Sequence, residues 1–122
     1  MNILLAIQAC IGGRPLPITI PSNWGAVTSA TPVNTATKTL TVPSGNPGNV
    51  RFNLTLFTGG TPRYVKNGGA AVGITDGDVV NFANGDTLLL RLAFGVSGDT
   101  ATITATDVAS GSVVGDAVLT VA

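Results

Sequence analysis

Histidine and glutamate are absent from this chain of 122 residues, and cysteine, tryptophan and tyrosine occur once each. Without histidine, one copy of the chain cannot build a Ser-His-Asp or Cys-His triad or a histidine proton shuttle. One cysteine and no histidine also leave too few ligands for a four-coordinate zinc site. The composition therefore predicts that the protein is not an enzyme and that it uses no cofactor.

Charge is scarce as well. Six basic residues balance six acidic ones, all of them aspartate, and charged residues make up 10% of the chain. Nucleic-acid binding needs clustered lysine and arginine, so we expect no nucleic-acid partner. A soluble protein normally carries about a quarter charged residues, and low charge with no net charge favours association. We therefore expect protein partners, in a homo-oligomer or a lattice of subunits.

The residues that usually populate exposed helix faces are also nearly missing, with one glutamine and two lysines. Valine, isoleucine and threonine instead supply 38 residues, and glycine and proline together supply 23. The first group favours strands and the second favours turns. This composition predicts an all-β protein with many turns.

The apolar run over residues 2–11 (NILLAIQACI) raises the question of export or a membrane span. A secretory signal requires a basic residue before its apolar run, and none precedes this one. The run is also too short to cross a bilayer. Ile7-Gln8-Ala9-Cys10 resembles a bacterial lipid-attachment signal without its basic start, which keeps a lipid anchor as an alternative. We expect no membrane partner, and an arm with a buried free thiol at Cys10 that packs four apolar side chains against protein: Ile3, Leu5, Ile7 and Ile11.

Residues 12–36 are rich in proline, glycine and threonine and lack sustained alternation, so they are predicted to form an extended arm or long loop. We accordingly expect an N-terminal arm over residues 1–37 and a sandwich over residues 38–122. Trp24 lies in the arm. It is either a plug over the end of the core or an interface anchor, because tryptophan is enriched at binding hot spots. With the four apolar side chains near the N-terminus, it completes the set of interface candidates.

Apolar and polar residues alternate regularly after Lys38, which is typical of half-buried strands. The expected inward rows are Val50, Phe52, Leu54 and Leu56; Leu88, Leu90, Leu92 and Phe94; and Ala101, Ile103 and Ala105. Turn signals such as Asn84-Gly85-Asp86 separate the strands. About seven short strands with such turns predict an Ig-like antiparallel β-sandwich, with a small barrel as the structural alternative.

Residues 61–122 also carry a recognisable pattern. Thr61-Pro62-Arg63-Tyr64-Val65-Lys66-Asn67-Gly68-Gly69 is followed by Asn84-Gly85-Asp86-Thr87-Leu88-Leu89-Leu90-Arg91, then by Ser97-Gly98-Asp99-Thr100-Ala101-Thr102-Ile103-Thr104, and finally by Gly115-Asp116-Ala117-Val118-Leu119-Thr120-Val121. The pattern resembles the small Ig-like domains of tailed-bacteriophage structural proteins and of some bacterial surface proteins. It covers about half of the chain.

The resemblance implies a virion structural protein, most simply a capsid decoration protein that binds the major capsid protein or other virion proteins. Its location would then be the virion, after synthesis in the host cytoplasm. Two alternatives stay open at this point. One is a tail, collar or fibre component, and the other is a bacterial surface adhesion module that binds carbohydrate.

Acidic and amide side chains concentrate in one stretch, with Asp76, Asp78, Asn81, Asn84 and Asp86 inside eleven residues. Calcium takes about six to eight oxygen ligands, and the EF-hand spacing is missing. A carboxylate pair for glycoside hydrolysis is equally disfavoured, because no aromatic platform lies nearby. We interpret these residues as turn formers, expect no metal, and expect Arg91 to pair with Asp86 or Asp99.

Overall fold

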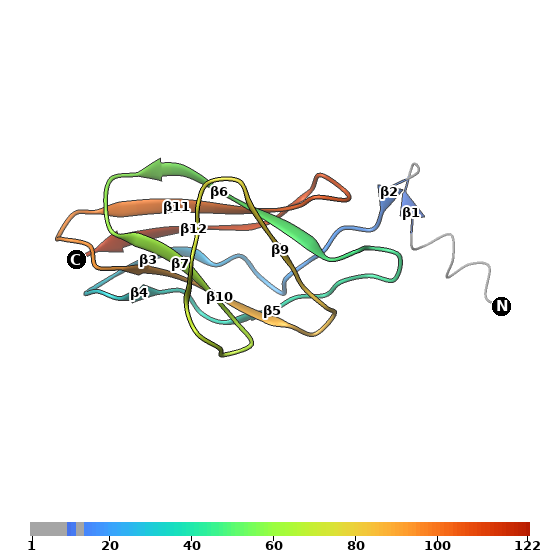
Figure 1. Ribbon diagram of the computed structural model, residues 1–122, viewed down its shortest axis with the longest axis horizontal. Coiled ribbons are helices and arrows are strands. Elements are labelled where there is room, and N and C mark those ends of the chain that lie inside the picture. Colours follow the sequence, from blue (N-terminus) through green and yellow to red (C-terminus); the bar gives the residue numbers. More distant parts are fainter. Residues whose placement is uncertain (1–9, 12–13) are drawn as a thin grey trace.

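The structure is a computed structural model that describes residues 10–11 and 14–122, with side chains described from Pro15 onward. Within these ranges there is no helix, and the strands form two five-stranded sheets and one short hairpin. The hairpin joins β1 (Cys10–Ile11) to β2 (Arg14–Pro15) and lies at the end of the molecule opposite the C-terminus (Figure 1).

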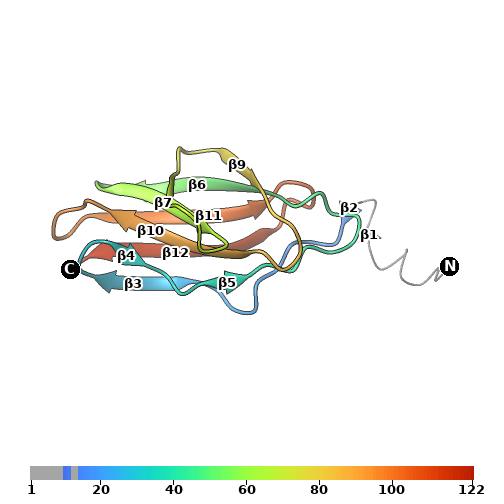
Figure 2. The same cartoon turned by 60° about the horizontal axis from the view of Figure 1, so that its bottom comes forward.

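The first sheet has the strand order β3-β12-β11-β6-β9. Its strands are β3 (Gly25–Ser29), β12 (Val113–Val121), β11 (Thr100–Asp107), β6 (Asn49–Phe57) and β9 (Asp78–Asn81). Neighbours are antiparallel except at β3, which runs parallel to β12 and lies beside it in Figure 2. This sheet is therefore mixed.

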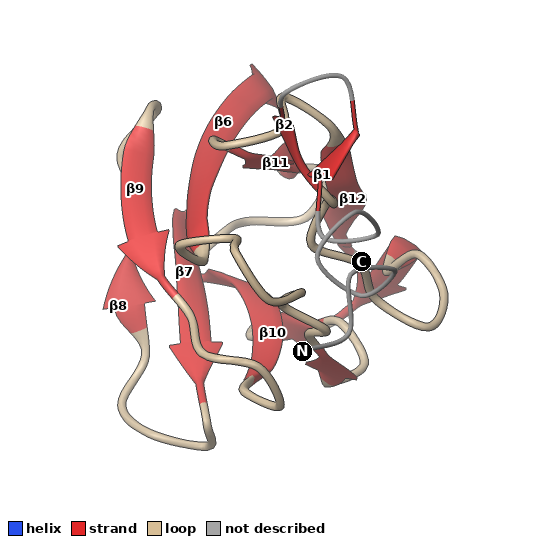
Figure 3. Ribbon diagram, turned by 90° about the vertical axis from the view of Figure 1, so that its right-hand side faces the viewer, coloured by secondary structure: helices blue, strands red, loops and turns tan. Residues whose placement is uncertain are grey.

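The second sheet has the path β4-β10-β7-β8, with β5 also pairing with β10. Its strands are β4 (Val33–Asn34), β5 (Lys38–Thr39), β7 (Thr61–Lys66), β8 (Val72–Gly73) and β10 (Thr87–Ala93). All of its pairings are antiparallel. Viewed along the long axis, β6, β11 and β12 lie across from β7 and β10 (Figure 3).

The core fills the space between the two sheets. Leu88, Leu90 and Leu92 are fully buried along β10 and meet Ala101, Ile103 and Ala105 of β11, which are fully buried as well. The alternation that the sequence shows in both strands places these side chains on one face. The prediction of an all-β sandwich is confirmed, and the narrower Ig-like label stays a prediction.

Residues 18–37 differ from the expected arm. β3 and β4 lie inside that segment and join opposite sheets, while Ile18 and Val33 are buried in the core. The expectation of irregular structure was wrong at these two strands, because their pairing with β12 and β10 is long-range and leaves no local signal. The sheets therefore begin well before the predicted boundary at residue 38.

Two of the expected inward rows end early. Phe94 is 75% exposed and has a φ of 59°, because the chain leaves β10 after Ala93 and turns. Leu56 is also exposed, since a β-bulge shifts the register of β6 against β11 between Thr102 and Ile103. The prediction that Phe94 and Leu56 point inward was wrong.

The remaining N-terminal predictions fall on residues that the structure does not describe. Ile3, Leu5 and Ile7 lie outside the described residues, and so does the side chain of Ile11, whose backbone belongs to β1. In the described part of the chain, no helix is long and apolar enough to span a membrane.

Candidate binding site

Three aspartates each stabilise a separate turn, and the three turns have the same hydrogen bonds. Asp78, Asp86 and Asp99 each accept a hydrogen bond through Oδ2 from the backbone N–H three residues earlier, at 2.8, 2.8 and 2.9 Å. Each donates its own backbone N–H to the carbonyl of that same earlier residue. The glycine before each aspartate has a φ near 90°, which a side chain rarely adopts. These carboxylates stabilise their turns, as the sequence interpretation expected.

Asp76 has a similar role between two elements. Its Oδ1 accepts hydrogen bonds from the backbone N–H of Leu54 and from the side chain of Asn53. These two bonds lower the pKa of Asp76 below its ordinary value of 3.8. The described residues contain no group of three or more cysteine, aspartate or glutamate side chains that could hold a metal ion.

Asp107 is the one carboxylate that is fully buried among the described residues. Four donors surround it: Ile18 N–H at 3.1 Å, Asn46 Nδ2 at 2.8 Å, Ser110 Oγ at 2.7 Å and Ala109 N–H at 3.1 Å. Burial alone would raise the pKa of Asp107, but these four hydrogen bonds outweigh it and lower the pKa. The aspartate cluster, meaning Asp107 with these donors, ties three loops together.

Trp24 belongs to the core. Its side chain is 6% exposed, and its Nε1 donates a hydrogen bond to the carbonyl of Leu88 at 3.4 Å. The aromatic ring also lies close to Gly115, where an added Cβ would come within 2.8 Å of it. Of the two interpretations left open by the sequence, this burial supports the core plug, and the interface role of Trp24 stays a prediction.

Arg91 does not pair with an aspartate. Its Nε donates a hydrogen bond to Asn34 Oδ1 at 2.6 Å, because β4 places Asn34 directly beside it in the sheet. Asp86 instead forms an ion pair with Lys66 at 3.8 Å, the one ion pair between described residues. The predicted pairing of Arg91 with Asp86 or Asp99 was wrong, since both carboxylates are used in their own turns.

The register of the second sheet also brings two arginines together. Arg63 of β7 lies directly opposite Arg91 of β10, and the row continues to Asn34 on one side and Gly73 on the other. Because Leu90 and Leu92 point into the core, Arg91 faces away from it. Like charges in directly opposed positions destabilise a sheet, so this arginine pair costs the fold free energy.

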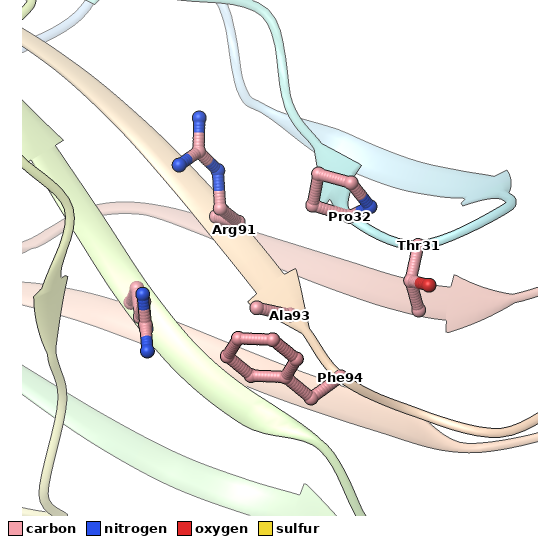
Figure 4. Close-up of a pocket in the computed structure, with 6 residues that line it drawn as sticks. Thr31, Pro32, Arg91, Ala93 and Phe94 are labelled. Carbon is pink, nitrogen blue, oxygen red and sulfur yellow. The ribbon is translucent and has the colours of Figure 1, made fainter.

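A surface pocket of about 340 Å³ lies at this arginine pair. Its lining residues are Thr31, Pro32, Arg63, Arg91, Ala93 and Phe94. Figure 4 shows Arg91, Ala93 and Phe94 along one wall and Pro32 and Thr31 across from them. The guanidinium of Arg63 lies over the Phe94 ring at 5.2 Å from its centroid, which is a cation–π contact.

Sequence reasoning missed this site. It named Arg63 only as part of the motif pattern and placed Phe94 in the core. The pairing of β7 with β10 decides which arginines become neighbours, and that register is a tertiary property. Comparison with known proteins found no match to the chain among family models, curated proteins or solved structures.

Proposed function

We propose that this chain is a binding module of a bacteriophage virion, most simply a capsid decoration protein. Its mechanism is non-covalent attachment to other virion proteins, in many copies, through surface that the sandwich leaves exposed. The virion assignment rests on the motif pattern of residues 61–122. The binding role rests on the low charge of the chain and on the surface described next.

The observation that carries the binding role is a group of exposed apolar side chains at the end of the sandwich where β10 stops. Phe94 and Val96 are 75% and 71% exposed, and Leu56 and Phe57 at the end of β6 are 57% and 47% exposed. The end of β6 and the turn that follows β10 lie at the same end of the molecule as the C-terminus (Figure 1). Large exposed apolar side chains at one end of a domain favour a protein-binding surface there.

Quantitative mass spectrometry of purified phage particles tests the assignment. A copy number in the hundreds per particle is the result expected for a head decoration protein, because such proteins cover a repeating lattice. A few to a few dozen copies per particle would instead assign the protein to the tail, collar or fibre. Absence from particles, with the chain in a membrane or secreted fraction, would overturn the virion assignment in favour of the adhesion module.

The predicted arm gives a second test. If the apolar residues 2–11 contact the shell, removing them will abolish particle association while the sandwich stays folded, because the described core lies between residues 18 and 121. Sedimentation with particles measures the first effect and circular dichroism checks the second. A truncated protein that still decorates particles at full occupancy would contradict a role for the arm.

A further inference from the structure

We propose that the pocket at Arg63, Arg91 and Phe94 binds an acidic segment of a partner protein, with its carboxylate on the two guanidinium groups. This inference names a site and a ligand chemistry, and it holds whether or not the partner belongs to a virion. Three local features of the pocket converge on it.

The first feature is unbalanced positive charge. The described residues form no ion pair with either Arg63 or Arg91, although the chain as a whole is neutral. Arg91 uses its Nε–H for Asn34, which fixes the side chain and leaves its two terminal nitrogens as donors. A guanidinium group matches the paired oxygens of a carboxylate, and such charge-assisted bonds are the strong ones. Both arginines line the same pocket, so both guanidinium groups can serve one acidic segment.

The second feature is the conformation of Phe94. A non-glycine residue with a positive φ is uncommon, and a bulky one is an outlier that the surrounding structure must hold in place. Here the conformation turns a large aromatic ring out of the core and under the guanidinium of Arg63. Phenylalanine and arginine are both enriched at protein–protein interfaces relative to the rest of the surface.

The third feature is the unoccupied surface next to the two arginines. Gly73 continues their row at the sheet edge, and a Cβ built on it would meet no atom within 4 Å. Leu89 and Val65, the next directly opposed pair along the same face, are only half-buried. This apolar surface next to positive charge suits a peptide that carries both acidic and aliphatic side chains.

These features favour a peptide over the other anions. Nucleic acid would need a run of basic residues, whereas the third arginine with a described side chain, Arg51, lies on β6 of the opposite sheet. A free phosphate would use the guanidinium groups but not Phe94, Pro32 or Ala93, which make up half of the lining residues. Opposed like charges and a positive φ at a bulky residue both run against local structural preferences, and such departures are expected at functional sites.

The test uses the full chain with its arginine Nε–H groups observed by NMR. The probe is the peptide acetyl-Ala-Leu-Asp-Glu-Leu-amide, and its neutral counterpart is acetyl-Ala-Leu-Asn-Gln-Leu-amide. We expect saturable, salt-sensitive shifts of the Arg63 and Arg91 signals with the acidic peptide, at a dissociation constant in the millimolar range or tighter. The neutral peptide should bind at least about tenfold more weakly, because it cannot form charge-assisted bonds.

Arg51 is the internal reference, since it is an exposed arginine on the opposite sheet. Equal shifts at Arg51, or no shift at Arg63 and Arg91, would overturn the proposal. Inorganic phosphate that binds as well as the acidic peptide would also overturn it, because the site would then be a general anion site. Arg63→Gln and Arg91→Gln should each weaken peptide binding about tenfold, and Arg51→Gln should leave it unchanged.

Discussion

The two ends of the sandwich hold charge in opposite ways. At one end, the carboxylate of Asp107 is fully buried and four donors from three loops surround it. At the other end, Arg63 and Arg91 face each other on the surface, and no described carboxylate pairs with them. The aspartate cluster is complete within the chain and stabilises it. In the proposal above, an acidic partner supplies the charge that the arginine pair lacks within the described residues.

Removing Asp107 should have the largest effect. Asp107→Ala removes the one acceptor that four donors from three loops share, and we expect it to lower the free energy of unfolding by about 3 kcal/mol or more. Urea unfolding measures this loss. Asp116→Ala is the matched control, because Asp116 is exposed, and it should cost less than about 1 kcal/mol. A loss at Asp107 as small as that of the control would mean that the cluster does not hold the loops.

Substituting one glycine at each end of the sandwich tests the same difference in the backbone. Gly48 lies beside the aspartate cluster with a φ of 86°, and a Cβ there would come within 2.0 Å of the Phe82 carbonyl oxygen. Gly73 lies beside the arginine pair in open space. We expect Gly48→Ala to cost about 2 kcal/mol or more and Gly73→Ala to stay within about 0.5 kcal/mol. Thermal and urea unfolding of the two variants should therefore differ clearly, and similar losses would contradict the contrast.

Low pH should reduce the stability that the hydrogen-bonded aspartates provide, and it should not affect the arginine pair. The folded-state pKa values of Asp76, Asp86 and Asp107 all lie below the ordinary value of 3.8. As pH falls below that value, the unfolded chain takes up protons before the folded chain does, so stability is lost on the way down. The urea midpoint of the wild-type chain should be constant above about pH 5 and fall below it, and the fall should be less steep for Asp107→Ala. A midpoint that rises with acid would contradict the hydrogen-bond assignments.

The smallest stability effect should come from the arginine pair. Each variant removes the like-charge repulsion and no described ion pair, but Arg63→Gln also loses the cation–π contact with Phe94 and Arg91→Gln the hydrogen bond to Asn34. Because these effects oppose each other, we expect a net change within about 0.5 kcal/mol. Unfolding in urea at low ionic strength gives the most sensitive measurement. A clear loss of stability would assign these arginines a structural role instead of a binding one.

Sequence patterns predicted the parts of this structure that are locally encoded. Alternation located the buried leucines of β10, and the glycine–aspartate pairs located three turns of one kind. The same patterns failed where distant pairing decides the outcome. β3 joins the sheet through parallel pairing with β12, and Phe94 leaves its row because the chain turns after Ala93. The arginine pair depends on the register of β7 against β10, which no local pattern contains.

The most direct test of the account compares particle binding by the wild-type chain and by the Arg63→Gln/Arg91→Gln double variant, with Arg51→Gln as the control. Sedimentation with purified particles should show wild-type and control chains bound, and the double variant, still folded, bound at least about tenfold more weakly. A wild-type chain that stays in the supernatant would contradict the virion assignment. A double variant that binds as well as the wild type would contradict attachment to the particle through the arginine pair.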